Sequence, residues 1–187
     1  LMDQLERLIS ELFGEHQVFH RVKYFEAFSN AFSLDLNVAN TTDLRQVVLL
    51  HIPGVNADQL SRDDCMDLLI SQVIARQFNG FTFVYDYPSS QASLAKIKTG
   101  DISVAERFEL FYGAMELANG FTELTDAKEQ RLRFLQDNER RKEQGLVPYP
   151  VDEAFLQALE QGLPECAGVA LGLDRLLMVM LGFDDIQ

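Results

Sequence analysis

The chain has 187 residues, of which 47% are hydrophobic and 14 are Phe, so it can bury the core of one domain. Its 16 basic and 29 acidic side chains give a net charge of −13. Proteins that bind nucleic acid through many phosphates usually show a broad basic face, and none is visible here. One basic run, residues 140–142, lies between Glu139 and Glu143 and is interpreted as a solvated helix face. tRNA is therefore not an expected partner of this chain.

The two cysteines, Cys65 and Cys166, are far apart and have neither CxxC nor zinc-ligand spacing. Reduced thiols in a cytoplasmic protein are the expectation. No apolar run approaches the length of a membrane span, and no signal peptide is present. The sequence thus predicts a cytoplasmic location and no membrane partner.

Hydrophobic periodicity divides the chain into a mainly helical section, residues 1–78, and a section with strands, residues 79–187. In the first section we expect helices over residues 3–13, 24–32, 41–50 and 62–74, the third capped by residues 41–43 and the fourth opened by a capping box at residues 61–64. In the second we expect a strand at 81–85, a loop at 87–99, a strand region at 105–118 interrupted near Gly113, helices at 126–144 and 152–161, a strand at 168–172 and a buried helix at 173–181. The predicted fold is α+β, a single domain with an antiparallel sheet flanked by helices.

Two carboxylates, Glu109 and Glu116, lie on either side of a turn near Gly113. If the turn is at residues 112–113 they lie directly opposite each other, and if it is at residues 113–114 they are diagonal neighbours. Both registers place them on one face of the sheet. Like charges across a hairpin are unfavourable unless a divalent cation binds them, and Mg²⁺ prefers oxygen ligands. The alternative is a pair of solvated surface acids.

A second acidic pair, Glu116 and Glu123, is separated by seven residues, so in a regular strand the two side chains would face opposite ways. A bulge at Asn119-Gly120 would return Glu123 to the face of Glu116. Acids that line one pocket suit a cationic substrate such as lysine. The alternative is a polar bend with surface acids.

Small residues alternate with larger ones in Gly-Val-Ala-Leu-Gly-Leu-Asp-Arg, residues 168–175. One face of this strand is therefore nearly bare, and a flat group could lie against it. Arg175 follows in the first turn of the next helix, where a guanidinium can stack on a ring and pair with phosphate. Tight strand–helix packing with a surface Arg is the alternative interpretation.

Taken together, these segments resemble class II aminoacyl-tRNA synthetases, and residues 168–175 resemble motif 3 of that class. The wider likeness, over about residues 80–183, is to the lysyl-tRNA synthetase group. It rests on these segments in order: 88–96, 106–111, 116–126, 130–134, 152–164 and 168–175.

Within that group the likeness is greatest to a paralogous subgroup that attaches a lysine-type amino acid to elongation factor P. Residues 91–95 read Gln-Ala-Ser-Leu-Ala where the tRNA enzymes usually have Val-Ser-Pro-Leu, and Ala170 stands where they usually have Gly. A methyl group at that position would narrow the amino-acid pocket, which fits a changed substrate.

The resemblance implies that five residues bind the nucleotide. Glu109 and Glu116 would hold Mg²⁺ with ATP, Leu117 and Gly172 would border the nucleotide, and Arg175 would pack on adenine or reach the terminal phosphate. Arg175 and Glu116 are the expected catalytic residues. The implied reaction is attack of the amino-acid carboxylate on the α-phosphate, which yields an aminoacyl-adenylate and pyrophosphate, followed by transfer to an acceptor.

Four further residues would bind the amino acid, expected to be lysine or β-lysine. Asn119, Phe121 and Ala170 would line the pocket, and Glu123 would meet an ammonium group. The expected acceptor is a lysine of elongation factor P.

The family's motif 1, and motif 2 with its Phe-Arg-x-Glu arginine, do not occur in the sequence. We therefore expect this chain to be the C-terminal part of a catalytic domain, nearly inactive alone, with any homodimer formed by the full-length protein. Two alternatives remain: a fragment of a lysine–tRNA ligase, and a non-catalytic synthetase-like module that binds a ligand without turnover.

Overall fold

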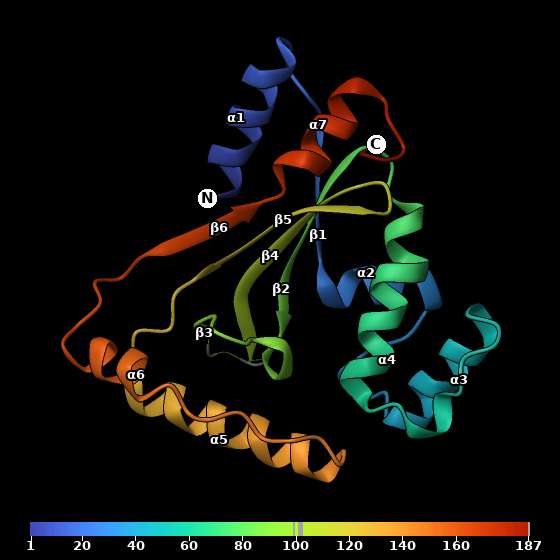
Figure 1. The fold of residues 1–187 in the computed structure, drawn as a ribbon. Helices are drawn as coiled ribbons and strands as arrows, with labels where there is room; N and C mark the ends of the chain where they lie inside the picture. Colours follow the sequence, from blue (N-terminus) through green and yellow to red (C-terminus); the bar gives the residue numbers. More distant parts are fainter. Residues whose placement is uncertain (99, 101–102, 187) are drawn as a thin grey trace.

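One six-stranded sheet forms the centre of the computed structural model, which describes residues 1–98, 100 and 103–186 (Figure 1). The strand order is β1-β2-β4-β5-β6, with β3 paired to β4; β1 runs parallel to β2, and the other pairs are antiparallel. The strands are β1 (Phe19–Lys23), β2 (Phe81–Pro88), β3 (Ile97–Lys98), β4 (Val104–Tyr112), β5 (Met115–Thr122) and β6 (Ala167–Leu171).

Helices cover both faces of the sheet. They are α1 (Met2–Phe13), α2 (Tyr24–Phe32), α3 (Thr41–His51), α4 (Arg62–Leu69), α5 (Ala127–Glu143), α6 (Glu153–Glu160) and α7 (Leu173–Leu181), with a π-helix at Ile70–Ile74 and short 3₁₀ turns at Ala57–Gln59, Ala75–Gln77 and Ser89–Gln91. No helix in the described ranges is both long enough and apolar enough to cross a membrane.

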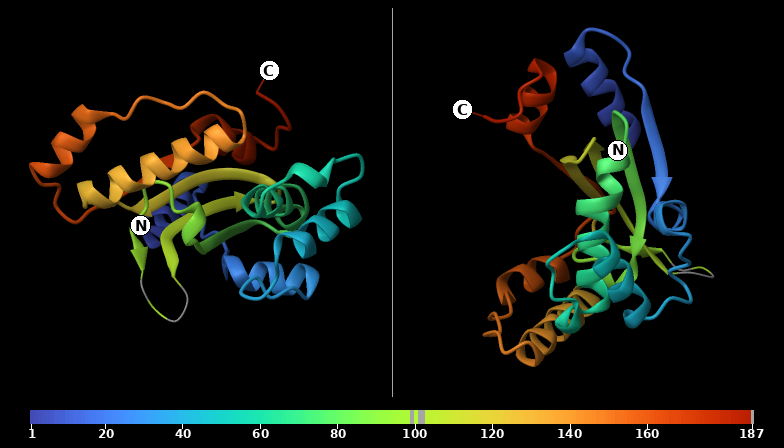
Figure 2. Two further views of the ribbon diagram at one scale, coloured as in Figure 1. Left: turned by 90° about the horizontal axis from the view of Figure 1, so that it is seen from below. Right: turned by 90° about the vertical axis from the view of Figure 1, so that its right-hand side faces the viewer.

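Two hydrophobic clusters define the two faces. One joins α2, α3 and α4 to Val84 and Phe111, and we call this side of the sheet the α4 face. The other joins α1 and α7 to Phe83, Phe108 and Leu110, and we call this side the α1 face. Helices α5 and α6 pack together at the end of the sheet away from α1 and α7 (Figures 1 and 2).

Local sequence signals explain most helix boundaries. Ser61 and Asp64 form the expected capping box of α4, and Asp126 and Asp152 cap α5 and α6. Helix α3 begins at residue 41 as expected, but its cap is Asn40 rather than residues 41–43. The predicted α+β fold, with a sheet flanked by helices, is confirmed.

Three expectations about elements are corrected. Strand β1 lies in the section expected to be mainly helical; its polar sequence gives little signal, and it forms because it pairs with the buried strand β2. The expected loop 87–99 begins and ends inside strands, β2 reaching Pro88 and β3 covering residues 97–98, while Thr99 lies outside the described residues. Helix α7 is not buried: within it only Leu176 is, and Leu173 is 71% exposed.

Candidate functional site

A β-bulge in β5 sets the directions of the site side chains. At the turn, Tyr112 pairs with Met115 and Phe111 with Glu116, as a turn at residues 113–114 requires; the register with Glu109 opposite Glu116 is wrong. Beyond a register shift Leu110 pairs with Ala118, so Leu117 is the extra residue. The expected bulge at residues 119–120 is therefore misplaced by about two residues.

The bulge at Leu117 nevertheless has the predicted effect, because it brings Glu123 to the same face of the sheet as Glu116. Leu117 and its neighbour Ala118 both belong to the α1-face cluster. Two successive side chains therefore point to the same face, which shifts the alternation of the strand by one residue. Asn119 pairs with Glu109, and Glu116 with the α4-face residue Phe111. Glu116, Asn119 and Glu123 thus point to the α4 face, although Glu116 and Glu123 are an odd number of residues apart. Leu117, also predicted for the site, points to the α1 face.

Glu109 is held by protein groups. Its side chain is 12% exposed, and its Oε1 accepts from Arg107 Nη2 at 2.5 Å and from Asn119 Nδ2 at 3.3 Å. Partial burial, and then the nearby Glu109 carboxylate, raise the pKa of Glu116. The two carboxylates therefore lie close enough for their negative charges to repel each other.

A cavity of about 560 Å³ opens between β5, β6 and α7. Six residues predicted for the site line it: Glu116, Leu117, Asn119, Ala170, Gly172 and Arg175. Arg175 Nη1 donates to the main-chain oxygen of Glu116 at 2.7 Å, which ties the start of α7 to β5. The guanidinium is thereby fixed in the wall of the cavity.

The bare face of β6 lies beside the acidic strip of β5. Ala170 pairs with Asn119 and Gly168 pairs with Phe121, so both small residues share the α4 face with their partners. A Cβ added at Gly168 would lie 3.3 Å from Glu123 Oε1, which places that carboxylate over the bare strand. The small residues of β6 and the Glu123 carboxylate therefore lie on the same face of the sheet, although neither Gly168 nor Glu123 lines the cavity.

Three of the predicted residues do not line the cavity. Glu109 accepts a hydrogen bond from Asn119, which does line the cavity. Glu123 lies near Gly168, and Phe121 packs against the α4-face core. No group of three or more His, Cys, Asp or Glu side chains within the described ranges could hold a metal ion. A cation at Glu109 and Glu116 would therefore need phosphate or water oxygens as further ligands, which is usual for Mg²⁺.

Sequence reasoning gave no role to Arg107, which contacts both Glu109 and Asn119. The signal was available, because Arg107 stands two residues before Glu109 and must share its face of the strand. The contact of Arg107 with Gln91, by contrast, joins segments that are far apart in the sequence.

Comparison with known proteins identifies the family of this chain. The family model "tRNA synthetases class II (D, K and N)" matches residues 1–187, so the chain belongs to the class II tRNA synthetase family.

The curated relatives of this chain include several ligases with closely similar sequences. The chain is 44% identical to the "Elongation factor P--(R)-beta-lysine ligase" of Proteus mirabilis over 190 residues, and 42% identical to those of Salmonella gallinarum and Klebsiella pneumoniae over 189 residues. These alignments cover 100% of this chain but only 58% of each relative. The chain thus spans a little over half the length of the ligases it matches.

Proposed function

We propose that this chain carries part of the site of an ATP-dependent ligase that activates lysine or a lysine-like amino acid as an aminoacyl-adenylate. One observation carries the proposal: Glu116 and Asn119 of β5 lie beside the small residues of the neighbouring strand β6, and Arg175 of α7 lines the same cavity. The family and the names of the relatives agree with this chemistry. The acceptor we propose is a lysine of elongation factor P. We propose that the reaction takes place in the cytoplasm and does not involve tRNA.

The residues of the cavity fit a nucleotide. Glu109 and Glu116 would bind Mg²⁺. Partial burial, and then the Glu109 carboxylate, raise the pKa of Glu116, and a divalent cation would offset the second of these effects. Bound Mg²⁺ would supply charge neutralisation as pyrophosphate leaves. Gly172 leaves room beside the main chain of Leu117, and Arg175 would stack on adenine or pair with phosphate.

The amino acid would lie along β6. Glu123 would accept from an ammonium group, and Asn119 would donate or accept at a polar atom of the substrate. Ala170, opposite Asn119, would limit the width of the pocket. Catalysis in such a site consists of orientation and charge neutralisation, because no side chain needs to form a covalent bond.

Calorimetric titration of this chain tests the proposal. We expect Mg·ATP to bind, with an affinity that Glu116→Ala abolishes, and lysine to bind, with an affinity that Glu123→Ala abolishes. Norleucine, which keeps the carbon chain and the α-ammonium group of lysine but lacks the ε-ammonium group, should not bind. Glu143→Ala on exposed α5 removes the same charge far from the cavity and is the matched control.

The proposal fails if neither ligand binds, or if norleucine binds as well as lysine. It also fails if the Glu116 and Glu123 variants bind as the unmodified chain does. The acceptor is tested separately, by offering elongation factor P with and without its target lysine to a catalytically competent preparation.

A further inference from the structure

Arg107 of β4 makes four contacts on the α4 face while its side chain is only 19% exposed. Nη2 donates to Glu109 Oε1 at 2.5 Å, Nε donates to Asn119 Oδ1 at 3.4 Å, and Nη1 donates to the main-chain oxygen of Gln91 at 2.8 Å. The guanidinium also lies over the ring of Tyr87, 4.6 Å from its centroid. A planar group that uses three nitrogens and one face in this way has little freedom to turn.

These contacts determine how two predicted site residues are presented. Because Asn119 Oδ1 accepts from Arg107, its Nδ2 is the atom that donates to Glu109. Both donors end on Oε1 of Glu109, so neither of them uses Oε2. Arg107 also offsets one of the two negative charges that Glu109 and Glu116 bring to this face.

A bulge in β2 brings the ring of Tyr87 under the guanidinium. The register of β2 against β4 shifts between Tyr85 and Tyr87, and the residue between them, Asp86, has a left-handed φ of 57°. Tyr85 therefore packs with the α1-face cluster and Tyr87 with the α4-face cluster. Burial raises the pKa of Tyr87 well above its ordinary value, so the ring stays neutral.

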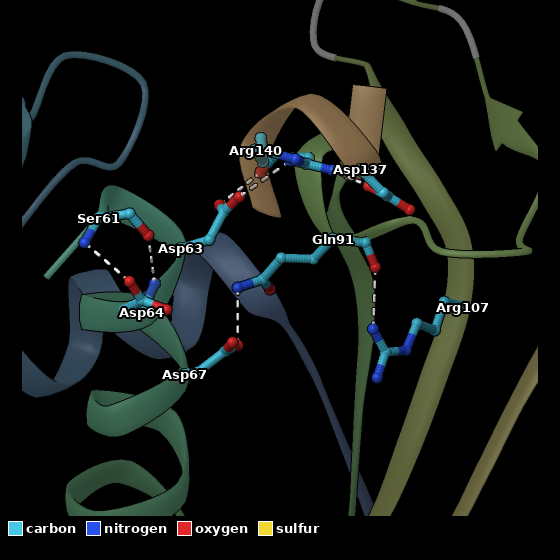
Figure 3. A network of polar contacts seen from close by, with 9 residues as sticks. Ser61, Asp63, Asp64, Asp67, Gln91, Arg107, Asp137 and Arg140 are labelled. Atoms are coloured by element: carbon cyan, nitrogen blue, oxygen red, sulfur yellow. Dashed lines mark hydrogen bonds and ion pairs between the residues drawn. The ribbon is translucent and has the colours of Figure 1, made fainter. Parts of the chain in front are cut away.

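The turn that holds Gln91 is itself attached to α4. Gln91 Nε2 donates to Asp67 Oδ1 at 2.8 Å, and Ser90 Oγ donates to Asp63 Oδ1 at 2.7 Å. Figure 3 shows Gln91 in the middle: its side-chain amide reaches Asp67 on α4, and its main-chain oxygen accepts from Arg107 on β4. Helix α4, the turn, Arg107 and the site strand thus form one continuous chain of polar contacts.

We propose that Arg107 is a positioning residue that orients Glu109 and Asn119 for ligand binding, and that Gln91 transmits the position of α4 to it. The statement rests on the proposed function for the identity of the ligands, but the orientation of Asn119 is independent of it. A lysine at this position would keep the positive charge, yet it could not donate to three acceptors while stacking on Tyr87. The geometry of the guanidinium is therefore the property that matters.

Arg107→Lys tests the proposal at constant charge. We expect its affinity for lysine to fall at least about tenfold, because misplaced binding groups lose that much or more. The resonances of the Asn119 side-chain amide should move in ¹H–¹⁵N spectra. Arg131→Lys is the matched control, since Arg131 pairs with Glu153 through two nitrogens at the exposed surface and lies outside the site. It should change neither measurement.

Gln91→Ala is the second variant, in case Arg107→Lys folds poorly. It removes the tether to Asp67 but leaves the main-chain acceptor, so we expect the same changes, smaller in size. Unfolding curves of each variant show that the measurements refer to folded protein.

Wild-type affinity for lysine together with unmoved Asn119 resonances in folded Arg107→Lys would overturn the proposal. If the unmodified chain binds neither lysine nor Mg·ATP, the proposed function fails, and the positioning role of Arg107 is then tested by the spectra alone. Moved Asn119 resonances then support the positioning by Arg107, and unmoved ones refute it.

Discussion

Gly120 of β5 should tolerate no side chain, and Gly120→Ala is the substitution whose cost the structure predicts best. A Cβ at this position would lie 2.5 Å from Cζ and 2.8 Å from Cε1 of Phe108, and 3.1 Å from the main-chain oxygen of Gly168. The Phe108 ring is 6% exposed and packs edge-on against Phe83, with centroids 5.6 Å apart. The ring therefore cannot move away freely.

Two effects of the substitution oppose each other. Alanine is favoured over glycine inside a strand by roughly 0.5–1 kcal/mol. Overpacking of a core costs about 1–3 kcal/mol, and here both a buried ring and the main chain of the next strand resist. We expect the clash to win, with a net loss of up to about 2.5 kcal/mol. The unfolding midpoint should then fall by up to about 10 °C, at roughly 2–4 °C per kcal/mol for a domain of this size.

Thermal and urea unfolding of matched variants measure this cost. Gly172→Ala is the control, because its Cβ would meet nothing closer than 3.5 Å and should change stability by less than about 0.5 kcal/mol. Phe108→Leu combined with Gly120→Ala should cost less than the two single changes summed, because a smaller neighbour relieves the clash. An unchanged midpoint for Gly120→Ala, or strict additivity with Phe108→Leu, would refute the reasoning.

Four further predictions follow from the same structure. Partial burial and the Asp63 carboxylate raise the pKa of Asp67 to about 6, so the folded state binds an extra proton between about pH 4 and 6 and loses stability as the pH rises through that window. Asp67→Asn should therefore exceed the wild type in stability at pH 7.5 but not at pH 4, by less than about 1 kcal/mol because solvent still reaches the residue and screens the charge. An equal difference at both pH values in urea titrations would contradict this. Glu123→Gln should weaken lysine binding about 10- to 100-fold, as expected for a lost charged hydrogen bond, and leave Mg·ATP binding unchanged in calorimetry; parallel loss of both ligands would argue for general damage. Ala170→Gly should widen the pocket and change the ratio of affinities for lysine and β-lysine in competition binding. A constant ratio would mean that Ala170 does not line the amino-acid pocket. Asp126→Ala removes the cap of α5 and should lower stability by about 1 kcal/mol in urea unfolding, and no loss would mean that water replaces the cap.

The sequence alone determined the features that depend on near neighbours in the chain. The capping box at Ser61 and the cap at Asp152 gave the starts of two helices. The alternation of small residues in β6 correctly predicted a bare face. These signals are readable because each involves residues that are only a few positions apart, where helix and strand geometry are known in advance.

The tertiary structure decided what depends on residues that are far apart in sequence. Strand β1 forms because it can pair with β2, and α7 is largely exposed because Leu176 is its only fully buried residue. The bulge lies at Leu117 because the α1-face core takes both Leu117 and Ala118, a preference that no local pattern shows. In the same way Arg107 meets Gln91 only when β4 and the turn after β2 come together. Sequence could name the acids of the site, but only the packing of β4, β5 and α4 shows what holds them in place.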